Sequence, residues 1–169
     1  MSETFEAVRK YLRGKGMIFT EHEDRIMVPM ACEHGKWQAM IVEWTGCLVC
    51  SSLFPVNAPS DRRAAVAELL ARLNWRLLIG NWEMDWSDGE IRYKSSLPLR
   101  NLVLTPSLVG EICGCNFDTF VGQWEMVMAV VAGKRTPAAA IEIPRRRRKR
   151  QKKAFDEVMR KAGFEPHEL

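Results

Sequence analysis

The sequence predicts an α+β fold in which helices pack on one antiparallel sheet. Short apolar segments separated by turn residues indicate strands joined as hairpins. Segments with apolar residues at helical spacing are grouped around these strands and do not alternate with them one for one, which favours α+β over a doubly wound sheet. A third observation is Asp88-Gly89, a turn signal whose flanking residues can pair as apolar residues on one face and as opposite charges on the other. The expected order of elements is α-β-β-β-(β)-α-β-β-α.

Composition sets the bounds of this prediction. The chain has 169 residues, with 47% apolar and 27% charged residues, as in an ordinary soluble globular protein. The chain contains no run of eighteen apolar residues, so no transmembrane helix is expected. The acidic N-terminus lacks the apolar core of a signal peptide. Five cysteines without such a signal fit a reducing compartment, so we expect a cytoplasmic protein.

The first third of the chain predicts a helix followed by strands. Residues 3–14 carry apolar side chains at helical spacing, and two glycines follow. Strands are expected over residues 17–20 and 25–30. The second of these contains Pro29, which suits an edge strand or a bulge because proline cannot donate to the ladder.

Two longer strands are expected over residues 36–45 and 47–56, with Gly46 between them. The first is apolar on both faces, with Trp37, Ala39 and Ile41 on one side and Met40, Val42 and Trp44 on the other. A strand of this kind is usually buried on both faces. One layer of helices covers only one face, so the second face must meet another layer of this chain or a second copy. We favour the second copy, which predicts a homodimer.

Two further helices are expected on either side of a hairpin. The first opens at Pro59-Ser60-Asp61 and ends near Asn74, since proline, serine and aspartate suit the start of a helix. The second opens at Thr105-Pro106, with the threonine as cap, and closes at Gly133.

Asp88-Gly89 predicts a two-residue type I′ turn, because both residues tolerate positive φ. This turn fixes the register of the hairpin and separates an apolar face from a charged one. Opposite charges paired across strands contribute roughly 0.2–1 kcal/mol each. The expected pairs are Trp86 with Ile91 and Met84 with Tyr93 on the apolar face, and Asp85 with Arg92 and Glu83 with Lys94 on the polar face.

Residues 70–77, 80–85 and 88–93 together resemble the YbjN-type domain family. Thr105-Pro106 also matches, because members open a helix with Thr-Pro after the hairpin. The resemblance covers residues 1 to about 133, with Trp82 where the family commonly has phenylalanine. It implies a fold like that of the bacterial type III secretion chaperones, often dimeric, and a noncatalytic regulatory role in sensory transduction or stress. It brings no catalytic residues.

Four cysteines raise the alternative of a zinc site. Cys47 and Cys50 form a C-x-x-C, and Cys113 and Cys115 form a C-x-C, so four thiolates are present for tetrahedral zinc. However, residues three apart on a strand point to opposite faces. A thioredoxin-like role fits worse, because the motif does not lie in a βαβ unit. We therefore expect cysteines that pack as small apolar residues, and no metal.

Other candidate chemistry has a structural interpretation. His22, His34 and His167 fall in expected turns or at the terminus, where exposed histidines are common. The carboxylates of Glu83, Asp85 and Glu90 could form a general acid–base pair. However, the expected hairpin gives Glu83 and Asp85 cationic partners. Phosphate-loop, nucleophile-elbow and zinc-protease motifs are absent. We expect no enzyme and no cofactor.

The C-terminal part differs from the rest in charge. Residues 1–133 hold thirteen Lys and Arg against sixteen Asp and Glu, a net −3, whereas residues 134–169 hold twelve against five, a net +7. We expect a domain over 1–133, a linker over 134–144 and a basic tail over 145–169. A short helix over 154–162, with Phe155, Val158 and Met159 on one side, fits this tail.

Eight cations within nine positions make the tail a candidate for binding polyanions. Dense like charges repel one another unless a polyanion neutralises them, and released counterions would make such binding depend on salt. The tail lacks interleaved aromatic residues, so nonspecific binding to nucleic acid or another polyanion is expected. A solvated charge run that aids solubility is the alternative. The candidate residues are Arg145, Arg146, Arg147, Arg148, Lys149, Arg150, Lys152 and Lys153.

Overall fold

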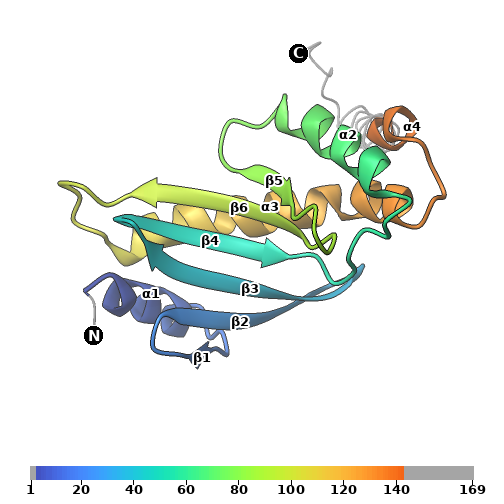
Figure 1. Cartoon of the computed structure of the whole chain (residues 1–169). Coiled ribbons are helices and arrows are strands. Elements are labelled where there is room, and N and C mark those ends of the chain that lie inside the picture. The colour runs from blue at the N-terminus through green and yellow to red at the C-terminus, as the bar shows by residue number, and fades with distance from the viewer. Residues whose placement is uncertain (1–2, 143–169) are drawn as a thin grey trace, which may run out of the picture.

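A computed structural model describes residues 3–142 as an α+β domain built on one antiparallel sheet, as the sequence predicts (Figure 1). The order of elements is the expected one, with a short helix added after the last long one. The elements are α1 (Glu3–Gly14), β1 (Thr20–Glu21), β2 (Arg25–Cys32), β3 (Gly35–Trp44), β4 (Cys47–Leu53), α2 (Arg63–Asn74), β5 (Asn81–Met84), β6 (Ile91–Pro98), α3 (Pro106–Val131) and α4 (Pro137–Ile141).

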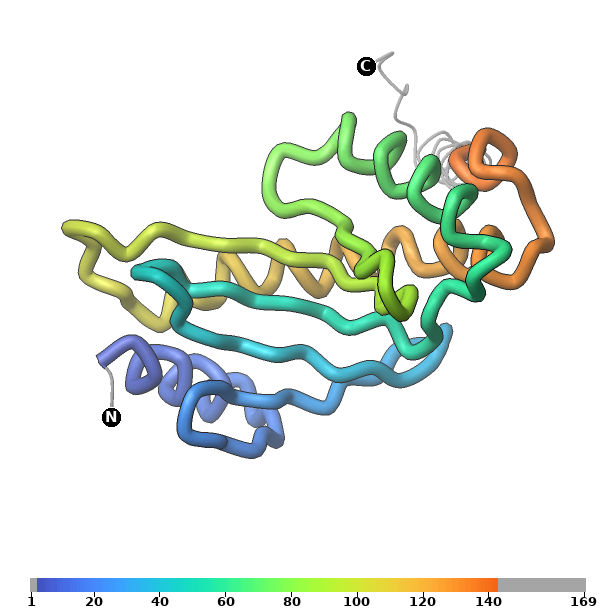
Figure 2. The backbone as a smooth tube through the Cα atoms, in the orientation of Figure 1, coloured from blue at the N-terminus to red at the C-terminus, as the bar shows by residue number. Residues whose placement is uncertain are grey.

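The six strands run in the order β1-β2-β3-β4-β6-β5. The long helix α3 lies along one face of the sheet and α1 packs beside it, while α2 lies next to β5 and α4 (Figures 1 and 2). Trp37, Ala39 and Ile41 point into this helical layer and are buried. Among the described elements none covers the opposite face of the sheet.

The core consists of two apolar clusters with a polar contact between them. One cluster is aromatic and includes Trp82 and Phe120, and the other lies under α1. Between them the buried Asn116 of α3 donates to the backbone oxygens of Cys50 and Tyr93, at 2.8 and 3.1 Å. Its own oxygen accepts from the Ser52 hydroxyl at 2.7 Å. These bonds fix the long helix to the neighbouring strands β4 and β6.

The β5–β6 hairpin differs from the predicted one in register. Glu83 lies opposite Arg92 and Trp82 opposite Tyr93, so the pairing is displaced by two residues. The two-residue turn prediction was wrong. The loop instead holds four residues, 86–89, closed by bonds from Asp85 N to Glu90 O and from Gly89 N to Asp85 O, both 2.9 Å.

A displacement of two residues preserves the faces of both strands. Trp82 and Tyr93 therefore still point into the core, and Glu83 keeps its cationic neighbours. Asp85, which was expected opposite Arg92, instead accepts from Ser87. Trp86 is the second exception. It was expected opposite Ile91 on the apolar face, but it lies in the loop and is 60% exposed.

The outer edge of β5 is covered by a side chain. Asn74, the last residue of α2, accepts from the Trp82 N–H at 2.8 Å and donates to the Trp82 oxygen at 3.0 Å. Both outward-facing backbone groups of Trp82, within the edge strand, are thus satisfied. At the other edge, β1 pairs only with residues 26–27 of β2, so Pro29 lies on an edge as expected.

The segment after α3 is more than a connector. Gly133 follows the helix with φ +67°, and α4 then begins with Thr136 as its cap. Pro137 and Ala140 are buried, and Ala140 joins the aromatic cluster. Residues beyond 133 therefore contribute to the core, within the stretch 134–144 that the sequence predicts to be a linker.

Candidate functional site

The open face of the sheet carries an apolar centre. Alternate residues of β2, β3 and β4 point away from the helices, so the second apolar side of β3 looks outward. Trp44 is 69% exposed at the end of β3, beside the tight turn at Thr45 and Gly46. The apolar side chains of this open face are Met27, Met40, Val42, Trp44, Cys47, Val49 and Leu53.

This face is hollowed by a groove of about 700 Å³. Met40, Val42 and Val49 form its floor, and Trp44 forms one end. Polar residues surround the floor, with Asp24 and Arg25 on one side and Arg92 and Lys94 with Ser96 on the other. An apolar floor inside a polar rim is the usual anatomy of a protein-binding surface.

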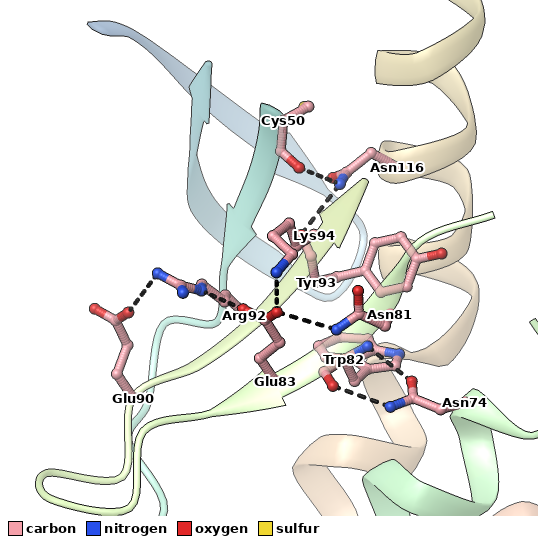
Figure 3. Close-up of polar contacts among 10 residues, drawn as sticks. All are labelled: Cys50, Asn74, Asn81, Trp82, Glu83, Glu90, Arg92, Tyr93, Lys94 and Asn116. Atoms are coloured by element: carbon pink, nitrogen blue, oxygen red, sulfur yellow. Dashed lines mark hydrogen bonds and ion pairs between the residues drawn. The ribbon is translucent and has the colours of Figure 1, made fainter. Parts of the chain in front are cut away.

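The charges on the rim are paired within the chain. Glu83 accepts from Arg92 Nε at 2.9 Å, from Asn81 Nδ2 at 3.1 Å, and from Lys94 Nζ (Figure 3). Arg92 also lies 4.0 Å from Glu90. Burial alone would raise the pKa of Glu83, but these donors outweigh it and hold the pKa below its ordinary value. The carboxylate therefore serves the ion-pair network rather than proton transfer.

The cysteines separate as the strand geometry predicts. Cys47 lines the open groove, whereas Cys50 is fully buried in the helical layer next to Cys113. Its contact with the Cys113 thiol, together with burial, raises the pKa of Cys50 well above the ordinary value. A thiol of this kind is a poor nucleophile. Within residues 3–142 no three His, Cys, Asp or Glu side chains are grouped to hold a metal ion.

The remaining candidate residues also have structural partners. Asp85 accepts from the Ser87 hydroxyl and backbone N–H at 2.6 and 2.8 Å, which lowers the pKa of Asp85 and closes the loop. His22 lies in the β1–β2 turn, where its N–H donates to Arg25 O. His34 lies in the next turn, but contrary to expectation only 14% of its side chain is exposed. Its Nε2 lies 3.4 Å from Glu33, and its ring is stacked near Trp124.

Sequence reasoning missed a second apolar surface, at the end of α2. Trp75 is 89% exposed and Leu78 is fully exposed in the loop to β5. Beside Trp75, a hollow of about 590 Å³ lies between α2 and α4. Its lining is Glu68, Ala71, Arg72, Trp75, Arg76, Ala138, Ile141 and Glu142.

Several predicted features lie outside the described residues. They are His167, the proposed helix over 154–162 and the eight cations between Arg145 and Lys153. Among the helices that the structure describes, none has both the length and the apolar character needed to cross a bilayer.

The comparisons with known proteins agree with the architecture. The sequence model of the YbjN family, described as "Putative bacterial sensory transduction regulator", matches residues 4–127. The match ends inside α3, so α4 and everything after it lie outside the family model. Among curated proteins no match was found.

A solved structure has a similar fold. It is the crystal structure of YbjN from E. coli, described as "a putative transcription regulator". The TM-score is 0.54 at 15% sequence identity, over 77% of this chain and 90% of that chain. At this identity the likeness concerns the fold.

Proposed function

The chain belongs to the YbjN family, and we propose that it is a noncatalytic regulatory module of the cytoplasm that acts through protein binding as a homodimer. The open face of the sheet carries this proposal. It is an apolar region of the sheet that no described element covers, and its occupant is a second copy of the chain.

The chemistry of the rim favours a second copy over a strongly charged partner. The cations Arg25, Arg92 and Lys94 are balanced by Asp24, Glu83 and Glu90 within the same face. A surface with both signs in balance can complement itself across a two-fold axis, where each patch meets its own copy. A polyanion or polycation gains little from such a rim.

The size of the face also suits a dimer. With about 4.8 Å between strands and about 3.3 Å per residue, the open face spans roughly 500–600 Å² in projection. A standard interface uses about 800 Å² of accessible surface per partner. Two sheets packed face to face, about 10 Å apart, would bury Met40, Val42 and Val49 at the centre.

Light scattering coupled to gel filtration tests this proposal. The full chain has a mass of 19.4 kDa, and we expect a particle of twice that mass. Trp44→Asp places a charge in the interface, so the particle should return to the monomer mass. Trp86→Asp is the matched control, because Trp86 is similarly exposed, 60% against 69% for Trp44, but lies in the β5–β6 loop. A monomeric full chain, or equal behaviour of both variants, overturns the proposal.

The basic tail supports a second candidate function, attachment to nucleic acid or another polyanion. Its support is the density of charge between residues 145 and 153, against a body of net −3. Filter binding with duplex DNA at increasing salt tests it. We expect affinity to fall steeply with salt and to vanish when the eight cations are changed to glutamine. Retention that is unaffected by that change contradicts it.

A further inference from the structure

We propose that the hollow between α2 and α4 is the docking site of the chain's own C-terminal segment 154–162. The hollow and the exposed Trp75 and Leu78 form a second apolar surface, separate from the open face of the sheet. Neither the family match, which ends at residue 127, nor the YbjN likeness assigns a role to it.

The composition of the hollow determines what fits. Ala71 and Ala138 are small and leave room between the two helices, while Ile141 and the indole of Trp75 provide apolar walls. The charges at the rim are two of each sign, and Glu68 is paired with Arg72 at 2.7 Å. The site therefore favours an amphipathic segment that presents apolar side chains, and it does not select for charge.

The position at which the described chain ends identifies the occupant. Glu142, the last described residue, lines the hollow itself, and 27 residues follow it. In that stretch the sequence places Phe155, Val158 and Met159 at the spacing of one helical face. This is the spacing with which an amphipathic helix enters an apolar groove.

The connection between site and segment has a suitable length. Residues 143–153 separate Glu142 from the apolar segment, and eleven residues can reach at most about 36–40 Å when fully extended. A tether of this length gives an effective concentration on the order of millimolar. The opposite net charges of residues 1–133 and residues 134–169, −3 and +7, also favour such docking.

Fluorine NMR on the full chain labelled with 5-fluorotryptophan tests the proposal, because each of the six tryptophans reports separately. The solvent isotope shift of the Trp75 resonance measures its contact with water. We expect this shift to be small in the parent chain. It should rise to that of the exposed Trp86 when Phe155, Val158 and Met159 are all changed to serine.

Two controls keep the experiment decisive. Asp156→Asn with Lys161→Gln changes the same segment without altering its net charge, and it should leave Trp75 protected. The resonances of Trp37, Trp82 and Trp124, which lie in the aromatic core, report whether each variant folds. Trp44 reports the open face, so loss of the dimer and loss of tail docking are seen separately.

The behaviour of the Trp75 resonance decides whether the proposal stands. Protection of Trp75 that depends on the three apolar tail residues and persists on dilution supports the proposal. A Trp75 resonance that is as exposed in the parent chain as in the serine variant overturns it. Protection that falls on dilution while the chain stays folded also overturns it, because the segment then comes from another molecule.

Discussion

The side chain of Asn74 bonds to both outward-facing backbone groups of Trp82, and so satisfies the edge of the sheet at this residue as a further strand would. An exposed strand edge is a template for aggregation. The residue that ends α2 thus also closes the sheet and places the Trp82 indole in the core, where it donates to Gln123 at 2.6 Å.

Asn74→Ala should destabilise the domain by about 1–3 kcal/mol, because the Trp82 N–H and oxygen are then left without partners. Asn74→Asp keeps the acceptor for the N–H but loses the donor to the oxygen, so part of the cost should remain. Urea unfolding measures both. If the alanine variant has the same urea midpoint as the parent chain, water replaces the hydrogen bonds of the Asn74 side chain without cost, which contradicts the prediction.

Asn116→Ala should cost about 2–4 kcal/mol, since it removes several buried hydrogen bonds at once and leaves Ser52 and two backbone oxygens short of a partner. Asn57→Ala is the control, because the Asn57 bond to Asp88 O is exposed. Its cost should stay within about 0.5 kcal/mol. Equal costs for the two variants would contradict the role given to Asn116.

Glu83 should stabilise the fold only above mildly acidic pH. Its folded pKa is lowered, so its contribution is present above the unfolded value of about 4.3 and is lost as pH falls through the folded value. Glu83→Gln should therefore cost about 1–2 kcal/mol at pH 7, and this cost should shrink as the pH falls through the folded pKa of Glu83. Thermal unfolding between pH 7 and pH 3 measures the difference.

A control exists for the same pH series. Glu68 pairs with Arg72 on the exposed side of α2, and exposed pairs contribute little. Glu68→Gln should therefore lie close to the parent chain at every pH. A Glu83→Gln difference that stays constant between pH 7 and pH 3 would show that the charge of Glu83 does not matter.

Gly89→Ala should destabilise more than Gly46→Ala, although both glycines have positive φ, +82° and +75°. A Cβ at Gly89 would lie 2.2 Å from the Ala58 oxygen, whereas one at Gly46 meets nothing within 4 Å. We expect about 1 kcal/mol for Gly46→Ala and at least twice that for Gly89→Ala. Similar costs would mean that the segment around Ala58 moves aside freely.

The β5–β6 hairpin shows how far sequence reasoning extends. The alternation of residues was enough to place Trp82 and Tyr93 in the core. It could not fix the loop, because Asp88-Gly89 is compatible with a two-residue turn as well as with the four-residue loop. The Asp85–Ser87 contact and the bond from Ala58 N to Gly89 O, at 2.7 Å, select the longer loop. That second bond joins segments far apart in sequence.

For a similar reason, one of the two apolar surfaces was predicted and the other was missed. The two apolar sides of β3 were visible from alternation alone, so the open face was expected. The exposure of Trp75 and Leu78 was not, because an apolar residue after a helix is as compatible with burial as with exposure. Only the folded structure shows that these side chains are exposed.

The most direct test of the central claim is to observe the second copy on the open face. A mixed sample of protomers carrying ¹³C-labelled methionine methyl groups and protomers labelled with ¹⁵N and ²H would show contacts between copies. We expect intermolecular nuclear Overhauser effects from the Met40 and Met27 methyls to backbone amides of β3 and β4. Their absence at concentrations where the dimer mass is observed, or their appearance only from methionines outside the open face, would contradict the account.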